Sequence, residues 1–314
     1  MKMIRDRTPL QFGNIGFIVF IVFSLISCGG SISDESTDRF DRGTIYVSAD
    51  ESFKNVIDSH VKVYESSYPE AKIIVNYKPE AECLKDFAVD SIRLIIATRS
   101  FSENEKAFME DSMNVIPSSA VIAYDAIAVI VNKESPDSMF TMEELKLVLQ
   151  AGFKKSLIPV FDGLNATSTI RFVIDSILNG AALTSEAEAA RNSEEVIDYV
   201  SRTPNAVGFL GVNWIGNKED TTQMSFLTKV TLASLESTDK PDAFVKPVQA
   251  NIYARRYPMV RDLVYTLKEK HTGLAHGFAN FLRGERGQLI FKRAYLVPAQ
   301  LQFINIRNAS FREE

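Results

Sequence analysis

From residue 44 onward, strand-like segments alternate with segments whose apolar residues recur at helical spacing. Residues 45–48 form a short apolar strand, and further strands are expected at 72–78 and 94–98. Between the first two strands, helical spacing is shown by Phe53, Val56, Ile57, His60, Val61 and Tyr64. This repeated strand–helix order predicts an α/β fold with a largely parallel sheet.

The apolar run 121–132 is long for one strand and carries Asp125 in its middle. A strand of this length can leave one lobe and enter a second, and the extended segment 245–257 is the expected return crossing. Alternatively, Asp125 caps a turn between two shorter strands. Further elements are expected as helices over 192–202 and 274–283, and as strands over 206–211 and 226–234.

The first 28 residues have the pattern of an export signal rather than of a folded domain. A basic start with Lys2, Arg5 and Arg7 precedes an apolar run, 15–26, which is shorter than the roughly 20 residues of a membrane span. The run ends at Cys28 in a Leu-Ile-Ser-Cys-Gly sequence that resembles a bacterial lipobox, which predicts cleavage before Cys28 and a lipid on its sulfur. A plain secretory signal with a chance cysteine is the alternative.

The composition excludes several classes of function. The net charge is −5 and basic residues are interspersed with acidic ones, so nucleic-acid binding is not expected. The three histidines and two cysteines make no metal-binding spacing, and Cys83 has no partner for a disulfide once Cys28 carries a lipid. No nucleophile motif or phosphate-binding P-loop occurs. We therefore expect neither an enzyme nor a cofactor, and no metal.

The segment Asn-Ala-Thr-Ser-Thr-Ile-Arg at 165–171 follows an apolar strand and opens a helix. The first N–H groups of a helix lack internal partners and carry partial positive charge. Thr167, Ser168 and Thr169 add hydroxyl donors there, which suits an oxyanion such as phosphate or sulfate. An ordinary N-cap is the alternative, because Ser and Thr are favoured at that position.

Several segments together resemble one family, the phosphate-binding lipoproteins of bacterial ABC uptake systems, within the type II periplasmic binding proteins. The similar segments are Tyr68-Pro69, Ala97-Thr98-Arg99, the run from Asp125 to Asn132, Asn205 to Phe209, Tyr257 to Arg261, Gly287 to Ile290 and Leu296 to Pro298. Each is weak alone, but their order and spacing are fairly specific and they extend over nearly the whole mature chain.

The resemblance implies a two-lobed type II periplasmic-binding-protein fold with two crossing strands and a cleft between the lobes. On this basis residues 1–28 are the signal peptide and 29–43 a flexible tether. Lobe 1 is expected over 44–122 together with 250–314, and lobe 2 over 123–249.

The resemblance also implies a ligand site. Ser52 would donate its hydroxyl and Phe53 its backbone N–H, while Arg99 would face the cleft. Thr167, Ser168 and Thr169 match the family's Ser-Gly-Thr, and Arg171 matches the arginine that often follows it. For Arg99 a surface salt bridge is the alternative, and for Arg171 solvent exposure.

Three positions need separate comment. The family's central glycine is Ser168 here, and an arginine found four residues earlier in some members is Gly163. Phosphate would then depend on Arg99, and on Arg171, for a bidentate guanidinium fork. Glu51 either accepts a proton from a protonated phosphate, which would favour phosphate over sulfate, or points to solvent.

The resemblance thus implies a monomeric lipoprotein of the cell envelope, periplasmic or associated with the outer membrane. It would be anchored to the membrane through its N-terminal lipid, bind inorganic phosphate between its lobes and deliver it to an ABC permease. The alternatives are a binding protein or sensor for another oxyanion, such as sulfate, molybdate or a phosphorylated metabolite.

Overall fold

A computed structural model describes residues 38–150, 157–163, 167–217, 219–268 and 271–300. The signal peptide, Cys28 and most of the tether therefore lie outside the described residues, as do Asn165 and Ala166. Within the described part of the chain, no helix is both long enough and apolar enough to cross a membrane.

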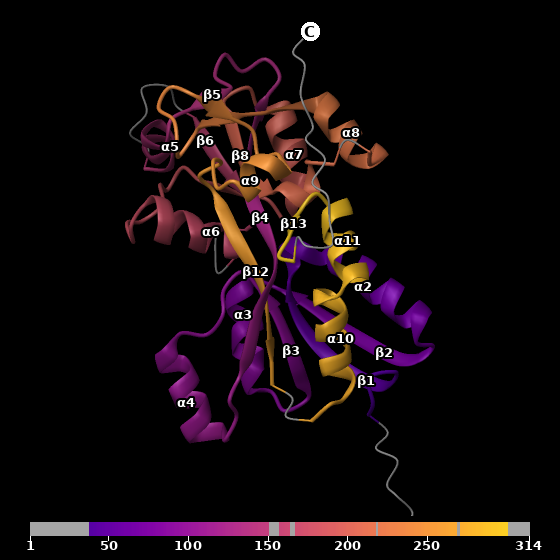
Figure 1. The fold of residues 1–314 in the computed structure, drawn as a ribbon. Coiled ribbons are helices and arrows are strands. Elements are labelled where there is room, and N and C mark those ends of the chain that lie inside the picture. The colour runs from indigo at the N-terminus through magenta and orange to yellow at the C-terminus, as the bar shows by residue number, and fades with distance from the viewer. Residues whose placement is uncertain (1–37, 151–156, 164–166, 218, 269–270, 301–314) are drawn as a thin grey trace, which may run out of the picture. The chain divides into compact units, whose positions relative to one another are not determined.

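One large sheet forms the centre of the fold, and its strand order is β2-β1-β3-β12-β4-β8-β6-β7 (Figure 1). The first part contains β1 (Arg42–Asp50), β2 (Glu70–Lys78), β3 (Ile92–Ala97), β12 (Val260–Leu267) and the start of β4 (Ser118–Asn132). The second contains the end of β4, β8 (Ala206–Gly211), β6 (Ile158–Phe161), β7 (Glu188–Ala189) and β9 (Val230–Leu232). Short β13 (Val297–Pro298) also pairs with β4.

β4 joins the two parts of the sheet. Its first half pairs antiparallel with β12, and its second half pairs antiparallel with β8. The β3–β12, β4–β9 and β4–β13 pairs are also antiparallel. The pairs β1–β2, β1–β3, β6–β7 and β6–β8 are parallel, which agrees with the predicted strand–helix order. We call the part around β1 and β3 lobe 1, and the part around β6 and β8 lobe 2. The residue boundaries expected from the sequence stay a prediction.

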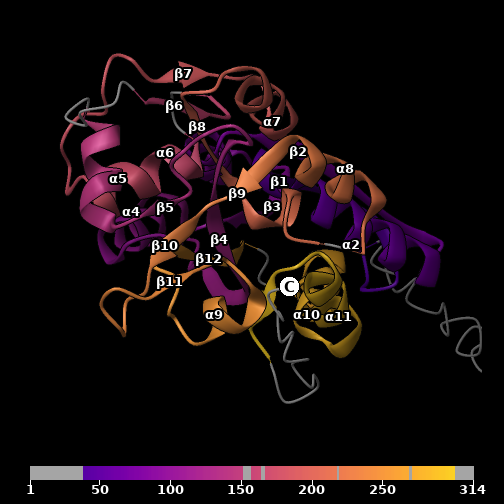
Figure 2. The ribbon, with the colours of Figure 1, turned by 90° about the horizontal axis from the view of Figure 1, so that it is seen from above.

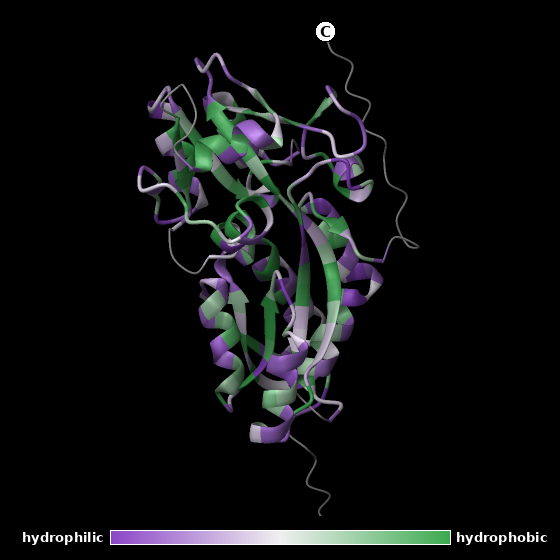
Figure 3. Cartoon of the chain, turned by 90° about the vertical axis from the view of Figure 1, so that its left-hand side faces the viewer, coloured by the Kyte–Doolittle hydropathy of each residue, from purple (hydrophilic) through white to green (hydrophobic). Residues whose placement is uncertain are grey.

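Helices cover both faces of lobe 1. They are α2 (Lys54–Ser67), α3 (Glu80–Lys85), α4 (Glu103–Met113), α10 (Leu274–Arg283) and α11 (Glu285–Arg293), and Figures 1 and 2 show α10 and α11 on the same side of the molecule. Alternate residues of β3 enter opposite cores: Leu94 and Ile96 join the one that contains α2 and α10, whereas Ile95 joins the one that contains α3. Burial on both faces explains why this strand is almost continuously apolar. Figure 3 shows hydrophobic residues along the strands in the middle of the molecule.

In lobe 2, helices also pack against the strands of the sheet. Its helices are α5 (Met142–Leu149), α6 (Ser168–Phe172) with the π-helical turn η3 (Val173–Ile177), α7 (Ser193–Arg202) and α8 (Thr221–Lys229). Val196 and Val200 of α7 pack on one face of β8 at Gly208, where an added Cβ would lie 2.8–2.9 Å from their methyl groups. A glycine is therefore required for the helix to approach this strand.

The remaining elements are short. A three-stranded sheet contains β11 (Phe244–Val245), β10 (Ser234–Glu236) and β5 (Met139–Phe140). Helix α9 (Gln249–Tyr253) precedes β12, and single 3-10 turns are η1 (Glu51–Phe53), η2 (Asp86–Ala88) and η4 (Val212–Trp214). The turns η1 and η4 matter most, because both border the candidate site.

One expectation for secondary structure is partly wrong and another is wrong. The first residues of the strand predicted at 226–234 are the end of α8, because Asp220 caps that helix by accepting from the Thr222 and Gln223 N–H groups, whereas residues 230–232 form β9 and Ser234 begins β10. The expected return crossing at 245–257 contains α9, and β12 makes the return instead. Asp125 lies inside the continuous strand β4, so the alternative of a turn there is also wrong.

Candidate functional site

A buried ion pair forms the base of the candidate site. Arg261 of β12 lies opposite Asp125 of β4 in the strand register, and its Nε donates to Asp125 Oδ2 at 2.8 Å. Their side chains are 2% and 0% exposed. The guanidinium also lies 5.2 Å from the centre of the Phe53 ring. The two long strands that join the lobes thus hold one fixed positive charge between them.

The same guanidinium contacts the hydroxyl segment predicted from the sequence. Arg261 Nη1 donates to Ser168 Oγ at 2.9 Å and lies 3.4 Å from Thr169 Oγ1. Thr167 is the N-cap of α6, since its Oγ1 accepts from the Ile170 N–H. The structure therefore shows the ordinary cap expected at Thr167, and it also brings the next two hydroxyls to a buried cation. All three hydroxyl residues are buried.

Two more buried carboxylates, Asp50 and Asp162, border this cation. Asp50 is the last residue of β1 and accepts from the Ser52 N–H at 3.0 Å, while Asp162 follows β6 and accepts from Ser193 Oγ at 3.3 Å. Burial raises the pKa of Asp50 to about 6, although the positive charge of Arg261 opposes the shift. Burial likewise raises the pKa of Asp125 and of Asp162. Three carboxylates around one guanidinium favour a ligand that can donate hydrogen bonds to the carboxylates.

Several polar atoms of this cluster have no hydrogen-bond partner among the described residues. They are Asp50 Oδ2, Ser52 Oγ, Asp125 Oδ1, Asp162 Oδ1, Asn213 Oδ1 and Arg261 Nη2. Buried polar atoms are normally paired, because an unpaired one costs about 1–3 kcal/mol. The set combines acceptors with a guanidinium donor and a hydroxyl, so it fits a small ligand that both donates and accepts hydrogen bonds.

Contacts between the lobes close the site on one side. The backbone carbonyl of Ser52, in lobe 1, accepts from Trp214 Nε1 at 2.8 Å and from Asn213 Nδ2 at 3.1 Å, both in lobe 2. Asn213 also accepts, through its carbonyl, from Asn55 Nδ2 of α2 at 3.3 Å. Ser52 and Phe53 thus lie at the lobe boundary, and Phe53 packs under Arg261. The contacts of Ser52 and Phe53 with a ligand stay a prediction.

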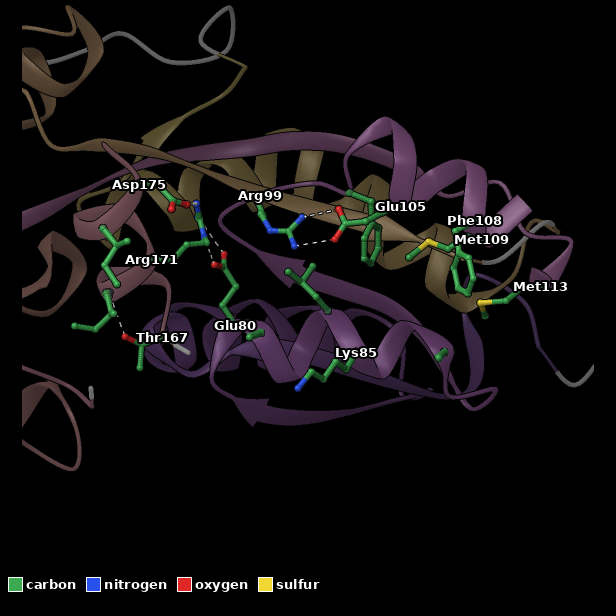
Figure 4. A pocket seen from close by; sticks show the side chains of 16 residues that line it. Glu80, Lys85, Arg99, Glu105, Phe108, Met109, Met113, Thr167, Arg171 and Asp175 are labelled. Atoms are coloured by element: carbon green, nitrogen blue, oxygen red, sulfur yellow. Dashed lines mark hydrogen bonds and ion pairs between the residues drawn. The ribbon is translucent and has the colours of Figure 1, made fainter. Parts of the chain in front are cut away.

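The other two arginines predicted for the site have acidic partners (Figure 4). Arg99 forms a fork with Glu105, with distances of 2.9 and 3.0 Å. Arg171 donates to Glu80 Oε2 at 2.5 Å and to Thr98 Oγ1 at 2.8 Å, which joins lobe 2 to lobe 1. Both line a separate, mostly apolar groove of about 770 Å³. A ligand-contact role for Arg99 and Arg171 stays a prediction.

Asp50, Asp162 and Arg261 were not assigned chemical roles from the sequence, although a signal for Arg261 exists. Along β12, Arg261 shares the parity of Leu263, Tyr265 and Leu267, which are all buried. A lone cation on an apolar strand face needs a buried anion. Asp125 is a lone carboxylate inside another apolar run, so the sequence also contains the anion that such a cation needs.

The chain is similar to known binding proteins along most of its length. A family model described as a PBP superfamily domain matches residues 34–286. The phosphate-binding protein PstS of Bacillus subtilis is 21% identical over 247 residues, covering 77% of this chain and 76% of the relative. PstS of Pseudomonas aeruginosa is 20% identical over 277 residues, covering 80% and 82%.

Solved structures show the same fold. A protein from Clostridium perfringens solved with bound phosphate superposes with a TM-score of 0.66 at 18% identity, covering 82% of this chain and 100% of that one. An ABC-type phosphate transport receptor from Vibrio cholerae superposes with a TM-score of 0.62 at 16% identity, covering 81% and 99%. The fold is that of the two-lobed type II periplasmic binding proteins, and because the family model spans more than half of its residues, the chain belongs to the PBP superfamily.

Proposed function

We propose that this protein is an extracytoplasmic solute-binding lipoprotein that captures inorganic phosphate between its two lobes and delivers it to an ABC permease. The relatives named as phosphate-binding proteins and the phosphate-bound structure of the same fold support this proposal. The observation that carries it is the buried guanidinium of Arg261, which contacts the hydroxyl segment at the start of α6 and is bordered by carboxylates with unpartnered oxygens.

The surplus of carboxylates favours phosphate over sulfate. Arg261 Nη2 and Ser52 Oγ are free to donate to anion oxygens among the described residues. Asp50 Oδ2 and Asp162 Oδ1 can only accept while ionised, so each needs a proton from the ligand. Singly charged phosphate carries two P–OH groups and satisfies both, whereas sulfate carries none and would face two carboxylates without a hydrogen bond.

The membrane anchor and the lobe boundaries that we propose are those predicted from the sequence. A lipid on Cys28 and the tether up to residue 43 would hold a monomer at the cell envelope. Lobe 1 would comprise 44–122 and 250–314 and lobe 2 123–249, with hinge bending at β4 and β12. We propose a transport role without catalysis. No group of His, Cys, Asp and Glu suited to holding a metal occurs in the part of the chain that the structure describes.

Thermal unfolding with and without ligand tests the proposal. A ligand present at 100 times its dissociation constant adds about 2.7 kcal/mol of stability, which raises the midpoint of a protein of this size by roughly 5–10 °C. We expect this shift with phosphate and little with sulfate. Ser52→Ala should reduce the phosphate shift, and Ser59→Ala, an exposed serine of α2, should not. No shift with phosphate, or equal shifts with both anions, contradicts the proposal.

A further inference from the structure

A second cavity opens from the candidate site toward solvent between the two lobes. It measures about 260 Å³, and we call it the vestibule. Its buried end contains Ser52 and Asp162, which are 2% and 6% exposed. Tyr77 and Trp214 line it further out, and Glu194 lies at its exposed end, at the start of α7.

The vestibule remains although the lobes already touch around it. Trp214 Nε1 reaches the Ser52 carbonyl at 2.8 Å, and Arg171 reaches Glu80 at 2.5 Å from the other lobe. The space is therefore not simply the gap of a fully open cleft. A water molecule takes about 30 Å³ of liquid volume, so the vestibule exceeds what an anion of five heavy atoms fills.

The polar atoms at the buried end match a ligand that extends beyond one phosphate group. The Ser52 side chain interacts with Asp162, but neither Ser52 Oγ nor Asp162 Oδ1 makes a hydrogen bond of ordinary geometry with a described residue, and both residues face the vestibule. In a phosphate monoester one P–OH becomes an ester oxygen, so a carboxylate loses one donor. A hydroxyl on the substituent, a few bonds away, can donate to Asp162 Oδ1 in its place.

The outer lining also suits such a substituent. Trp214 and Tyr77 offer aromatic surface for its carbon atoms, as ligand pockets commonly do. Lys54 and Arg191 line the vestibule together with Glu51 and Glu194, and the two basic side chains pair with Asp58 and Glu195. The outer lining is therefore polar, which suits a hydroxylated substituent. An orthophosphate ion would leave this part of the lining without a contact.

The geometry points to a phosphate monoester with a small hydroxylated substituent as a second ligand class, its phosphate at the Arg261 site and its substituent in the vestibule. This inference rests on the proposed function, because the phosphate group is held by the same residues. Glycerol 3-phosphate is the simplest probe, since its two hydroxyl oxygens lie three and four bonds from its ester oxygen. We expect it to compete with orthophosphate for a single site.

Calorimetric titration of the mature chain with orthophosphate and with glycerol phosphate tests the inference. We expect dissociation constants within tenfold of each other. Glu194→Trp should fill the vestibule and weaken glycerol phosphate at least tenfold, while orthophosphate changes less than threefold. Glu143→Trp is the matched control, because Glu143 is exposed at the same position of α5 and lies outside the vestibule, so neither affinity should change.

The outcomes separate the inference from the proposed function. Binding of orthophosphate without binding of glycerol phosphate overturns the inference and leaves the proposed function standing. Binding of both ligands with no selective loss in Glu194→Trp overturns the placement of the substituent in the vestibule. Failure of both ligands to bind overturns the inference together with the proposed function on which it rests.

Discussion

Arg261 and Asp125 face each other across β12 and β4, 136 positions apart in the sequence, with Nε and Oδ2 2.8 Å apart. Both side chains are almost completely removed from solvent. A buried pair of this kind adds little net stability, because desolvation of the two charges offsets their attraction. Its location at the junction of the lobes, beside the hydroxyls of α6, indicates a role in holding a ligand.

Removal of this cation should strongly destabilise the protein. Arg261→Ala leaves Asp125 buried without its partner, which costs about 3–5 kcal/mol. Urea unfolding followed by circular dichroism measures the loss. Arg255→Ala is the control, since Arg255 pairs with Asp262 at half-exposed positions and such pairs contribute about 0–1 kcal/mol. A loss below 1 kcal/mol in Arg261→Ala would show that the pair is not buried as described.

Asp50 should make stability depend on pH. Burial raises its pKa in the folded protein to about 6 from 3.8, so between these values the folded state binds more protons than the unfolded state. The native protein therefore loses stability from this group as pH rises from about 4 to 6, by up to about 3 kcal/mol. Asp50→Asn lacks this loss, so its stability relative to the native protein should increase across that window.

Unfolding of both proteins at pH 4.5, 5.5 and 7 measures the difference. Asp58→Asn, on the exposed side of α2, provides the same chemical change outside the buried cluster and should show no such trend. A constant difference between Asp50→Asn and the native protein over this range would mean that Asp50 ionises normally in the folded state.

The contact between Arg171 and Glu80 should favour the closed arrangement of the lobes. Glu80 is buried in lobe 1 and accepts from Arg171 of lobe 2 as well as from the Thr98 N–H and hydroxyl. Glu80→Gln weakens the bridge, so we expect phosphate to dissociate several times faster, as measured by stopped-flow exchange. Glu82→Gln, an exposed change on the same helix, should leave the rate unaltered. An unchanged rate in Glu80→Gln would exclude the bridge as a contact that holds the lobes closed.

For Arg99, the role predicted from the sequence and the contacts seen in the structure differ. The family resemblance implies a contact with the ligand, whereas the structure places the guanidinium in a fork with Glu105. A ligand contact by Arg99 predicts that Arg99→Ala weakens phosphate binding more than tenfold, with Lys106→Ala on α4 as the control. A change below threefold in the same titration would show that Arg99 serves only the fork with Glu105. Thr169→Val removes a hydroxyl close to Arg261 and should also weaken binding clearly.

Much of the fold could be predicted because its signals are local. Thr141 and Asn192 each cap a helix by accepting from the N–H of a glutamate three residues later, a spacing that is visible in the sequence, and α10 spans the expected residues. His60 is buried in the core, as its place on an apolar helical stripe indicated. The first residues of the strand expected at 226–234 belong to α8 instead. Asp220, the N-cap of that helix, lies before the apolar residues that suggested a strand.

Only part of the candidate site could be predicted from the sequence, for a different reason. Thr167 to Thr169 form a contiguous motif, so their position at a helix start can be read from sequence. The pairing of Arg261 with Asp125 depends on the register between two distant strands, which no local pattern fixes. The acidic partners of Arg99 and Arg171 are likewise set by tertiary packing, so the sequence could not show them, and a ligand contact by either arginine stays a prediction.

Calorimetric titration of the mature chain with orthophosphate at pH 6.5, in buffer with and without excess sulfate, tests the central claim most directly. The account predicts saturable binding with one phosphate per chain, in the micromolar range or tighter, and the same affinity when sulfate is present. Absence of binding, or displacement of phosphate by an equal concentration of sulfate, would contradict a site in which buried carboxylates accept the ligand's protons beside Arg261.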